Sequence, residues 1–219
     1  MSELAKTTIL IVGALFPIVN PLGNCPIFLA LTPHYSTSAR SALAWRIAVN
    51  SFILLIVSFL IGTHVLSFFG ISLPVVQIGG GLVVISTGWT MLKYEDPGAT
   101  DVGDAVKPRD VSSNAFYPLT LPLTVGPGSI SVAIALGANE PRYHGVVNLL
   151  GLLAALIGSL LIAVSIFLCY GFAERLGRLL GASAMNVIMR LSSFLLVCIG
   201  VQILWNGVKA LLVTLPPVH

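Results

Sequence analysis

The stretch FPIVNPLGNCPIF, residues 16–28, decides the fold of this chain. It places three prolines, one glycine and two asparagines inside an apolar run that is long enough to cross a bilayer. A proline inside a helix removes a hydrogen bond and clashes with the preceding turn, at a cost of about 3 kcal/mol. Lipid cannot satisfy the freed carbonyl groups, so such a backbone persists at membrane depth only where protein buries it or where it lines a cavity.

A second stretch, YPLTLPLTVGPGSI at residues 117–130, repeats this proline spacing. The prolines correspond at one constant offset: Pro17 with Pro118, Pro21 with Pro122, and Pro26 with Pro127. We therefore predict that these prolines keep two membrane helices broken. Two broken spans in corresponding halves of a chain indicate a binding site near the middle of the membrane.

The composition is that of a polytopic membrane protein. Of the 219 residues, 56% are hydrophobic and 9% are charged, and the mean hydropathy is +0.98. Soluble domains carry about 25% charged residues. At about 20 residues per span, six crossings fit and leave no room for a soluble domain. The net charge of +3 is too small and too scattered to suggest a nucleic-acid partner.

The six predicted spans cover residues 7–31, 41–68, 73–92, 115–136, 145–172 and 185–213. The polar stretch at 94–114 separates two three-helix halves, residues 1–93 and 115–219. FFGIS at 68–72 precedes the third span, and LLGAS at 179–183 precedes the sixth. Because each half has an odd number of spans, the second half must lie inverted. The predicted fold is therefore all-α, with two inverted three-helix repeats whose first helices are broken.

The distribution of positive charge predicts the orientation of the chain. Eight of the eleven lysines and arginines would lie on one side of the membrane, and Lys6, Arg142 and Lys209 on the other. The positive-inside rule assigns the eight to the cytoplasm. Both termini are then periplasmic, and the linker at 94–114 is cytoplasmic.

The predicted membrane interior carries no formal negative charge, since all eight acidic residues fall in predicted loops or at the termini. Proton relays and cation pathways usually place a carboxylate inside the bundle, and hard metal ions prefer oxygen ligands. No metal, cofactor or catalytic group is therefore predicted. The four scattered histidines also form no H-E-x-x-H pair of an intramembrane metalloprotease.

Neutral polar residues concentrate at the predicted breaks instead. Asn20 and Asn24 flank Pro21 and Gly23 in the first span, whereas Thr120, Thr124, Gly126, Gly128 and Ser129 flank Pro122 and Pro127 in the fourth. An interrupted helix exposes N–H groups that suit a carboxylate and carbonyls that suit an ammonium group. Asparagine amides can donate and accept. These residues are predicted to bind a small zwitterionic solute, although a single proline more often marks only a packing kink.

These motifs resemble the MarC family of bacterial inner-membrane proteins, which includes SnatA-type small neutral amino acid transporters and is similar to the wider LysE superfamily of exporters. The resemblance rests on residues 16–28, on FGIS at 69–72 with the following glycines at 79–81, and on residues 118–130. It implies that the discontinuous first and fourth helices meet at the substrate site. Carried over by position, one half of that site is Asn20, Pro21, Gly23 and Asn24, and the other is Pro122, Thr124, Gly126, Pro127 and Gly128.

The sequence thus predicts a secondary transporter of glycine- or alanine-like amino acids in the inner membrane, in which one half of the chain rocks against the other. An exporter of drugs or other metabolites is the alternative, and a non-transporting scaffold or enzyme is a more distant one. The direction of transport, the coupling ion and a homo-oligomeric state stay open. The glycines at 79–81 are expected to permit close helix packing.

Overall fold

The computed structural model describes residues 2–33, 35–93, 115–140, 142–143 and 146–214. Its helices are α1 (Glu3–Val19), α2 (Cys25–Leu31), α3 (Thr37–Phe68), α4 (Leu73–Leu92), η1 (Ala115–Thr124), α6 (Pro127–Asn139), α7 (Leu149–Gly171) and α8 (Ala173–Thr214). One feature departs from the predicted all-α fold: β1 (Arg142–Tyr143) and β2 (Val146–Val147) pair as a short antiparallel ribbon between α6 and α7.

By length and apolarity, four of the described helices can cross a membrane: α3, α4, α7 and the part of α8 from Ser183 to Val213. The segments η1 and α6 together make a fifth candidate, bent by 70°. The predicted first span consists of α1, with 17 residues, and α2, with 7, and neither piece is long enough to cross alone. The structure is therefore that of a polytopic membrane protein with four or five candidate spans.

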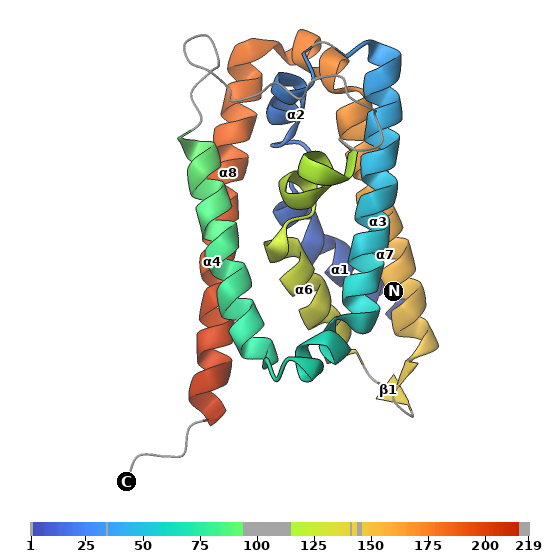
Figure 1. Cartoon of the computed structure of the whole chain (residues 1–219), viewed down its shortest axis with the longest axis vertical. Coiled ribbons are helices and arrows are strands. Elements are labelled where there is room, and N and C mark those ends of the chain that lie inside the picture. The colour runs from blue at the N-terminus through green and yellow to red at the C-terminus, as the bar shows by residue number, and fades with distance from the viewer. Residues whose placement is uncertain (1, 34, 94–114, 141, 144–145, 215–219) are drawn as a thin grey trace.

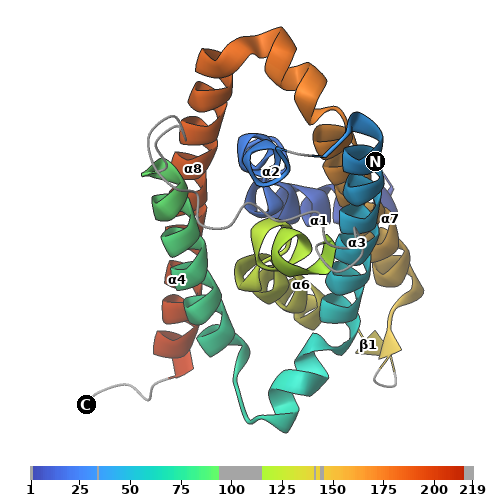
Figure 2. The same ribbon diagram turned by 45° about the horizontal axis from the view of Figure 1, so that its top comes forward.

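The long helices form two pairs that flank the interrupted segments. Figure 1 shows α4 beside α8 on one side of the molecule and α3 beside α7 on the other, with α1, α2 and α6 between them, and Figure 2 shows the same arrangement from a tilted view. Each pair takes one helix from before residue 94 and one from after residue 114. The part of the chain before residue 94 and the part after residue 114 therefore interdigitate; they do not form two separate bundles.

The interrupted segments run in opposite directions. Through α1 and α2 the chain moves toward the end of the molecule where α3 begins, whereas through η1 and α6 it moves toward the end where β1 lies (Figure 1). The apolar core includes residues of α1, α2, α3, η1 and α7, so the interrupted backbone is enclosed by protein on this side. Such enclosure is what a broken helix requires at membrane depth.

Small residues bring α4 and α8 into backbone contact. A Cβ at Gly81 would lie 2.7 Å from the carbonyl oxygen of Gly200, and one at Gly88 would lie 2.9 Å from that of Ser193. A Cβ at Gly207 would be equally close to the backbone of α4. The contact positions lie seven residues apart along each helix. The residue numbers on α8 decrease as those on α4 increase, so the two helices are antiparallel. This confirms the predicted close packing for Gly81, and we call this contact line the glycine seam.

The two related motifs before α4 and in α8 share a backbone conformation. Gly70, in FFGIS, has φ 67°, and Gly181, in LLGAS, has φ 75°. Glycine reaches this left-handed region without the steric cost that a Cβ imposes. The chain turns at Gly70 before α4 begins, and it kinks at Gly181 before the membrane-spanning part of α8. The motifs are thus alike in structure as well as in sequence.

A buried arginine holds the end of α2 in place. Arg40, near the start of α3, donates from one guanidinium nitrogen to the carbonyl oxygen of Thr32 (2.8 Å) and from Nε to its hydroxyl (3.2 Å). The last carbonyls of a helix have no intrahelical partner, so these bonds cap α2. The same guanidinium forms an ion pair with Glu174 of α8 at 3.0 Å. Three elements are thereby joined at one end of the molecule.

The glycine seam predicts a sharp difference between neighbouring glycines. Replacing Gly81 with alanine places a methyl group against backbone atoms of α8, and we expect this overpacking to destabilise the protein by about 1–3 kcal/mol. Gly79 is the matched control, because a Cβ there meets nothing within 4 Å. Thermal unfolding of the purified protein in detergent would show a lower midpoint for Gly81→Ala than for Gly79→Ala. Equal midpoints for the two variants would contradict the seam.

Candidate functional site

The first interruption is built around a left-handed asparagine. Asn20 caps α1 with φ 47° and ψ 55°, and asparagine is one of the few residues that tolerates this conformation. Its side-chain oxygen accepts a hydrogen bond from the backbone N–H of Gly23 at 3.1 Å, which closes the turn between the helices. Pro17, predicted to break the helix, lies inside α1, which continues to Val19. Pro26 lies in the first turn of α2, where proline is tolerated.

The second interruption lies where the prolines predict it. Tyr117 and Leu121 have extended backbones within η1, with φ and ψ of −124° and 128° and of −117° and 121°. Each directly precedes a proline, and a following proline disfavours the helical region for the residue before it. Gly126 is then the extended N-cap of α6, and Pro127 is in its first turn. The chain bends by 70° between the two pieces.

The hydroxyl groups of the second interruption support its own backbone. Thr120 donates to the carbonyl of Ala115 at 2.6 Å, and Thr124 donates to that of Leu119 at 2.7 Å. Because the hydroxyl hydrogen of Thr124 is used in this way, the hydroxyl of Tyr170 is the donor in the 3.0 Å contact between them. Both threonines are buried. They were predicted to bind solute, and in the structure each donates its hydroxyl hydrogen to a backbone carbonyl five residues earlier in the chain.

A single amide joins the two interruptions. The side-chain nitrogen of Asn24 donates to the carbonyl of Val19, at the end of α1, at 3.0 Å. It also donates to the carbonyl of Leu123, in η1, at 3.2 Å. Asn24 is 4% exposed; its bond to Val19 is buried, and its bond to Leu123 is partly buried. The broken segments therefore meet, as the sequence motifs imply, and they meet through a bond between side chain and backbone.

Aromatic and sulfur contacts anchor α2 to α7, and the sequence pattern did not reveal them. The rings of Phe28 and Tyr170 stack with centroids 4.5 Å apart and planes 9° apart. The thiol of Cys25 lies 3.3 Å from the carbonyl oxygens of Pro21 and of Cys169. A tyrosine near the end of an apolar span is typical of an interfacial aromatic belt. Nothing in the sequence marks Tyr170 as a buried partner of the breaks.

One polar group at the first interruption is unused. The side-chain nitrogen of Asn20 is buried and has no hydrogen-bond partner among the residues that the structure describes. The residue is 8% exposed. Leaving a buried donor unpaired costs about 1–3 kcal/mol, and an unpaired group in a native structure is therefore a candidate for interaction with something that the protein binds.

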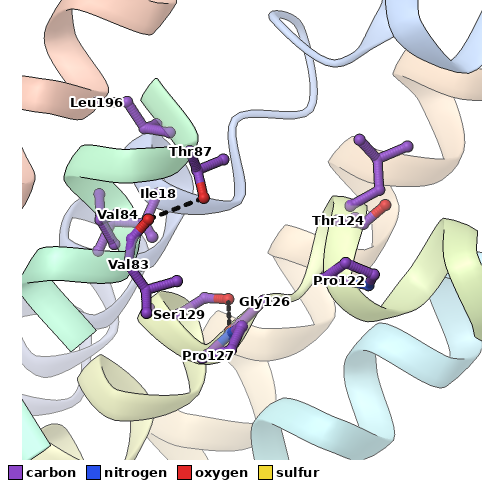
Figure 3. A pocket seen from close by; sticks show the side chains of 12 residues that line it. Ile18, Val83, Val84, Thr87, Pro122, Thr124, Gly126, Pro127, Ser129 and Leu196 are labelled. Carbon is purple, nitrogen blue, oxygen red and sulfur yellow. Dashed lines mark hydrogen bonds between the residues drawn. The ribbon is translucent and has the colours of Figure 1, made fainter. Parts of the chain in front are cut away.

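Three cavities lie along the interrupted segments, on the side that faces α4 and α8. The central cavity, of about 70 Å³, lies between α4 and the second interruption (Figure 3). The wide cavity, of about 460 Å³, shares Thr87, Pro122 and Leu123 with it. The amide cavity, of about 290 Å³, shares Ile18 with the central cavity and is lined by Gln77, Asn139 and Asn206. No charged side chain lines any of the three among the described residues.

The predicted residues are distributed unevenly over these cavities. Those of the second interruption line the central cavity: Pro122, Thr124, Gly126, Pro127, Gly128 and Ser129. Asn24 and Pro118 line the wide cavity, together with Pro122, and Pro17 lines the amide cavity. The remaining predicted residues line none of the three: Asn20, Pro21, Gly23, Pro26 and Thr120. Among the predicted solute-binding residues of the first interruption, only Asn24 lines a cavity, whereas most of those of the second interruption line the central cavity.

Among the residues that the structure describes, no three histidine, cysteine, aspartate or glutamate side chains lie close enough to hold a metal ion. The polar groups that face the cavities are amides, hydroxyls and backbone atoms, which form hydrogen bonds with neutral or zwitterionic molecules.

These features define a polytopic integral membrane protein with two interrupted segments that meet beside uncharged cavities. The chain belongs to the MarC family: the family model of MarC family integral membrane proteins matches residues 5–212. The resemblance of the proline-containing motifs is thereby confirmed over nearly the whole length.

Several relatives are named inner membrane protein MarC. The protein from Salmonella typhimurium is 33% identical over 220 residues, which cover 98% of this chain and 99% of the relative. The Citrobacter koseri protein is 34% identical over 223 residues, and the Escherichia coli O1:K1 / APEC protein is 30% identical over 219, with the same coverage. No solved structure matches the chain. The relatives' names and the apolar helices together support a multi-pass protein of the inner membrane.

The bridging amide of Asn24 predicts a marked loss of stability on its removal. In Asn24→Leu two interior carbonyls lose their donor, and each unsatisfied group costs about 1–3 kcal/mol. Asn206→Leu is the matched control, because this exposed amide is bonded to Gln202, another exposed side chain, at 2.9 Å. Thermal unfolding in detergent would show a large decrease in midpoint for Asn24→Leu and little change for Asn206→Leu. Similar midpoints would show that the bridge contributes nothing to stability.

Proposed function

We propose that this chain is a secondary transporter of small neutral amino acids, similar in size to glycine and alanine, which works across the inner membrane by alternating access. The observation that carries the proposal is the Asn24 bridge between two interrupted segments, beside cavities whose described linings bear no charge. An interrupted pair of helices near the membrane centre is the usual construction of a transporter site. An uncharged lining favours a solute without net charge, because burying an unpaired ion is costly.

The first turn of α6 supplies the groups for the solute carboxylate. The N-cap residue Gly126 has no side chain that could cap the helix, and Pro127 has no N–H. The N–H groups of Gly128 and Ser129 are then the first free donors of this 13-residue helix, and both residues line the central cavity. The helix dipole adds partial positive charge at this end. The unpaired side-chain nitrogen of Asn20 supplies a further donor when the first interruption opens.

Carbonyl oxygens supply the acceptors for the ammonium group. The carbonyl of Leu123 receives one hydrogen bond from Asn24 and keeps a second lone pair. Leu123 lines both the central and the wide cavity, so it lies where the two cavities meet. A zwitterion can therefore find a donor set and an acceptor set within one uncharged site.

The proposal includes the six-helix inverted arrangement predicted from the sequence. In it, α1 with α2 and η1 with α6 are equivalent broken helices, α3 is equivalent to α7, and α4 is equivalent to the long part of α8. The matching left-handed glycines Gly70 and Gly181 support this equivalence, as do the opposite directions of the broken segments (Figure 1). The positive-inside rule then assigns both termini to the periplasm and residues 94–114 to the cytoplasm.

The helix pairing suggests moving parts that differ from the two halves of the chain. The glycine seam holds α4 and α8 at backbone contact, although they belong to different halves. Rocking one half against the other would pull this seam apart. We propose instead that α4 and α8 move as one unit against α3, α7 and the interrupted segments, because the cavities lie between these two groups.

Reconstituted protein provides the direct test of transport. Liposomes that contain the purified chain are expected to take up labelled glycine with saturable kinetics, and unlabelled alanine should compete. In a parallel thermal-unfolding panel of the common amino acids, only small neutral ones should stabilise the protein, by about 2.7 kcal/mol at a concentration of 100 times Kd. Absence of both saturable uptake and stabilisation would refute the proposal.

A disulfide between α4 and α6 tests the proposed moving parts. A Cβ at Gly80 would lie 2.6 Å from the Cβ of Ser131, so a bond with its usual Cβ separation of about 3.8 Å requires a shift of about 1 Å. In a background without the native cysteines, oxidised Gly80→Cys/Ser131→Cys should lose glycine uptake, and a reductant should restore it. Each single variant under oxidant serves as the control. Full uptake by the cross-linked protein would show that α4 does not move against α6.

The wide cavity favours a second candidate, an exporter of drugs or other metabolites. Its volume of about 460 Å³ exceeds what glycine needs, and Ile27, Leu31 and Met91 give it an apolar wall. If this candidate is right, several unrelated apolar compounds should stabilise the protein, and the amino acids should not compete with them.

A further inference from the structure

Helix α4 forms a wall of the central cavity that neither proline-containing motif supplies. Val83, Val84 and Thr87 line the cavity from α4, and Pro122 and Thr124 lie across from them on η1 (Figure 3). We propose that α4 determines which solutes this chain accepts, with Val84 limiting their size and Thr87 forming a hydrogen bond with them. This inference rests on the proposed transport function and extends it to selectivity.

Val84 is the side chain of α4 that lies against the first turn of α6, where it can limit the size of a bound solute. Val84 is 3% exposed and packs in one cluster with Leu196 and Ile18, all of which line the central cavity. A Cβ added to Gly128 would overlap a methyl group of Val84, so this side chain stands directly against the first turn of α6. Any solute held by the N–H groups of that turn therefore has the Val84 methyl groups beside it.

The central cavity is the smallest of the three cavities along the interrupted segments. Its volume of about 70 Å³ is roughly half of the ~150 Å³ that an engineered protein cavity needs to bind benzene. Aliphatic side chains of Ile18, Val83, Val84 and Leu196 form one wall, and residues 122–129 of the second interruption contribute the other. Shortening one of these aliphatic side chains enlarges the cavity where the side chain of a bound amino acid would extend.

Thr87 is the polar residue of α4 at the junction of two cavities. It lines both the central and the wide cavity, and its side chain is exposed to them. Its hydroxyl donates to the carbonyl of Val83 at 2.9 Å, so its oxygen lone pairs remain free to accept a bond. An ammonium group is a strong partner for such an acceptor. Thr87 is one of the three residues that line both cavities.

Competition assays in proteoliposomes test the inference. Uptake of labelled glycine by the full chain is measured against unlabelled glycine, alanine, valine and leucine. In Val84→Ala the preference for glycine over valine should fall roughly tenfold or more, since each methylene in an apolar pocket is worth about 10–200-fold. Thr87→Val should weaken glycine binding about tenfold, and Thr87→Ser should restore it. Val75→Ala, on the exposed face of the same helix, is the control that should behave as wild type.

The outcomes separate this inference from the proposed function. If wild type transports glycine but Val84→Ala and Thr87→Val keep its selectivity and affinity, α4 does not determine selectivity and the inference is wrong, although transport stands. If wild type takes up no amino acid, both proposals are wrong. Should Val84→Ala fail to fold, Val83→Ala decides the size limit, because Val83 lines the same cavity and is 37% exposed.

Discussion

The side-chain amide of Asn24 is the contact on which the interior of this protein depends. Two interrupted segments, distant in sequence, each leave carbonyl groups without a helical partner, and lipid offers none. One –NH2 group serves a carbonyl from each segment, Val19 and Leu123, and so fixes where the segments meet. Leucine would fill this volume but could not donate. The first role of this asparagine is therefore to satisfy two backbone carbonyls, and any contact with a solute comes in addition.

The remaining polar groups of the interruptions are of two kinds: those that form hydrogen bonds with the backbone and those that have no partner among the described residues. Thr120 and Thr124 are committed to carbonyls of η1, and Tyr170 donates to the second of them. The groups left over are the first N–H groups of α6 and the amide nitrogen of Asn20. Beside them, on α4, the hydroxyl oxygen of Thr87 can still accept a bond, although its hydrogen is donated to Val83. Their chemistry is that of a neutral site, in keeping with the absence of acidic residues from the predicted spans.

Proline spacing was sufficient to place both interruptions, because a missing N–H and a fixed φ act locally. Proline spacing alone did not show at which residue the first helix ends or which side chains the interruptions contact. Pro17 resembles its counterpart Pro118 in sequence, yet it lies inside a continuous α1, and the turn forms at Asn20 instead. The sequence did not show that the hydroxyls of Thr120 and Thr124 donate to backbone carbonyls of η1, and it gave no sign of the wall formed by α4 beyond a run of glycines. The membrane class and family followed from composition and motifs, whereas the cavities depend on which helices pair.

The glycine seam also has a consequence for how the protein is made. During synthesis α4 leaves the ribosome well before α8, its partner across the seam. Of the four long candidate spans α4 is the least apolar, and its seam glycines have no α8 backbone to pack against until that helix has been made. The seam can therefore close only after the last helix has been made, and a nascent chain that stops after residue 114 would lack one of the two sides of the seam.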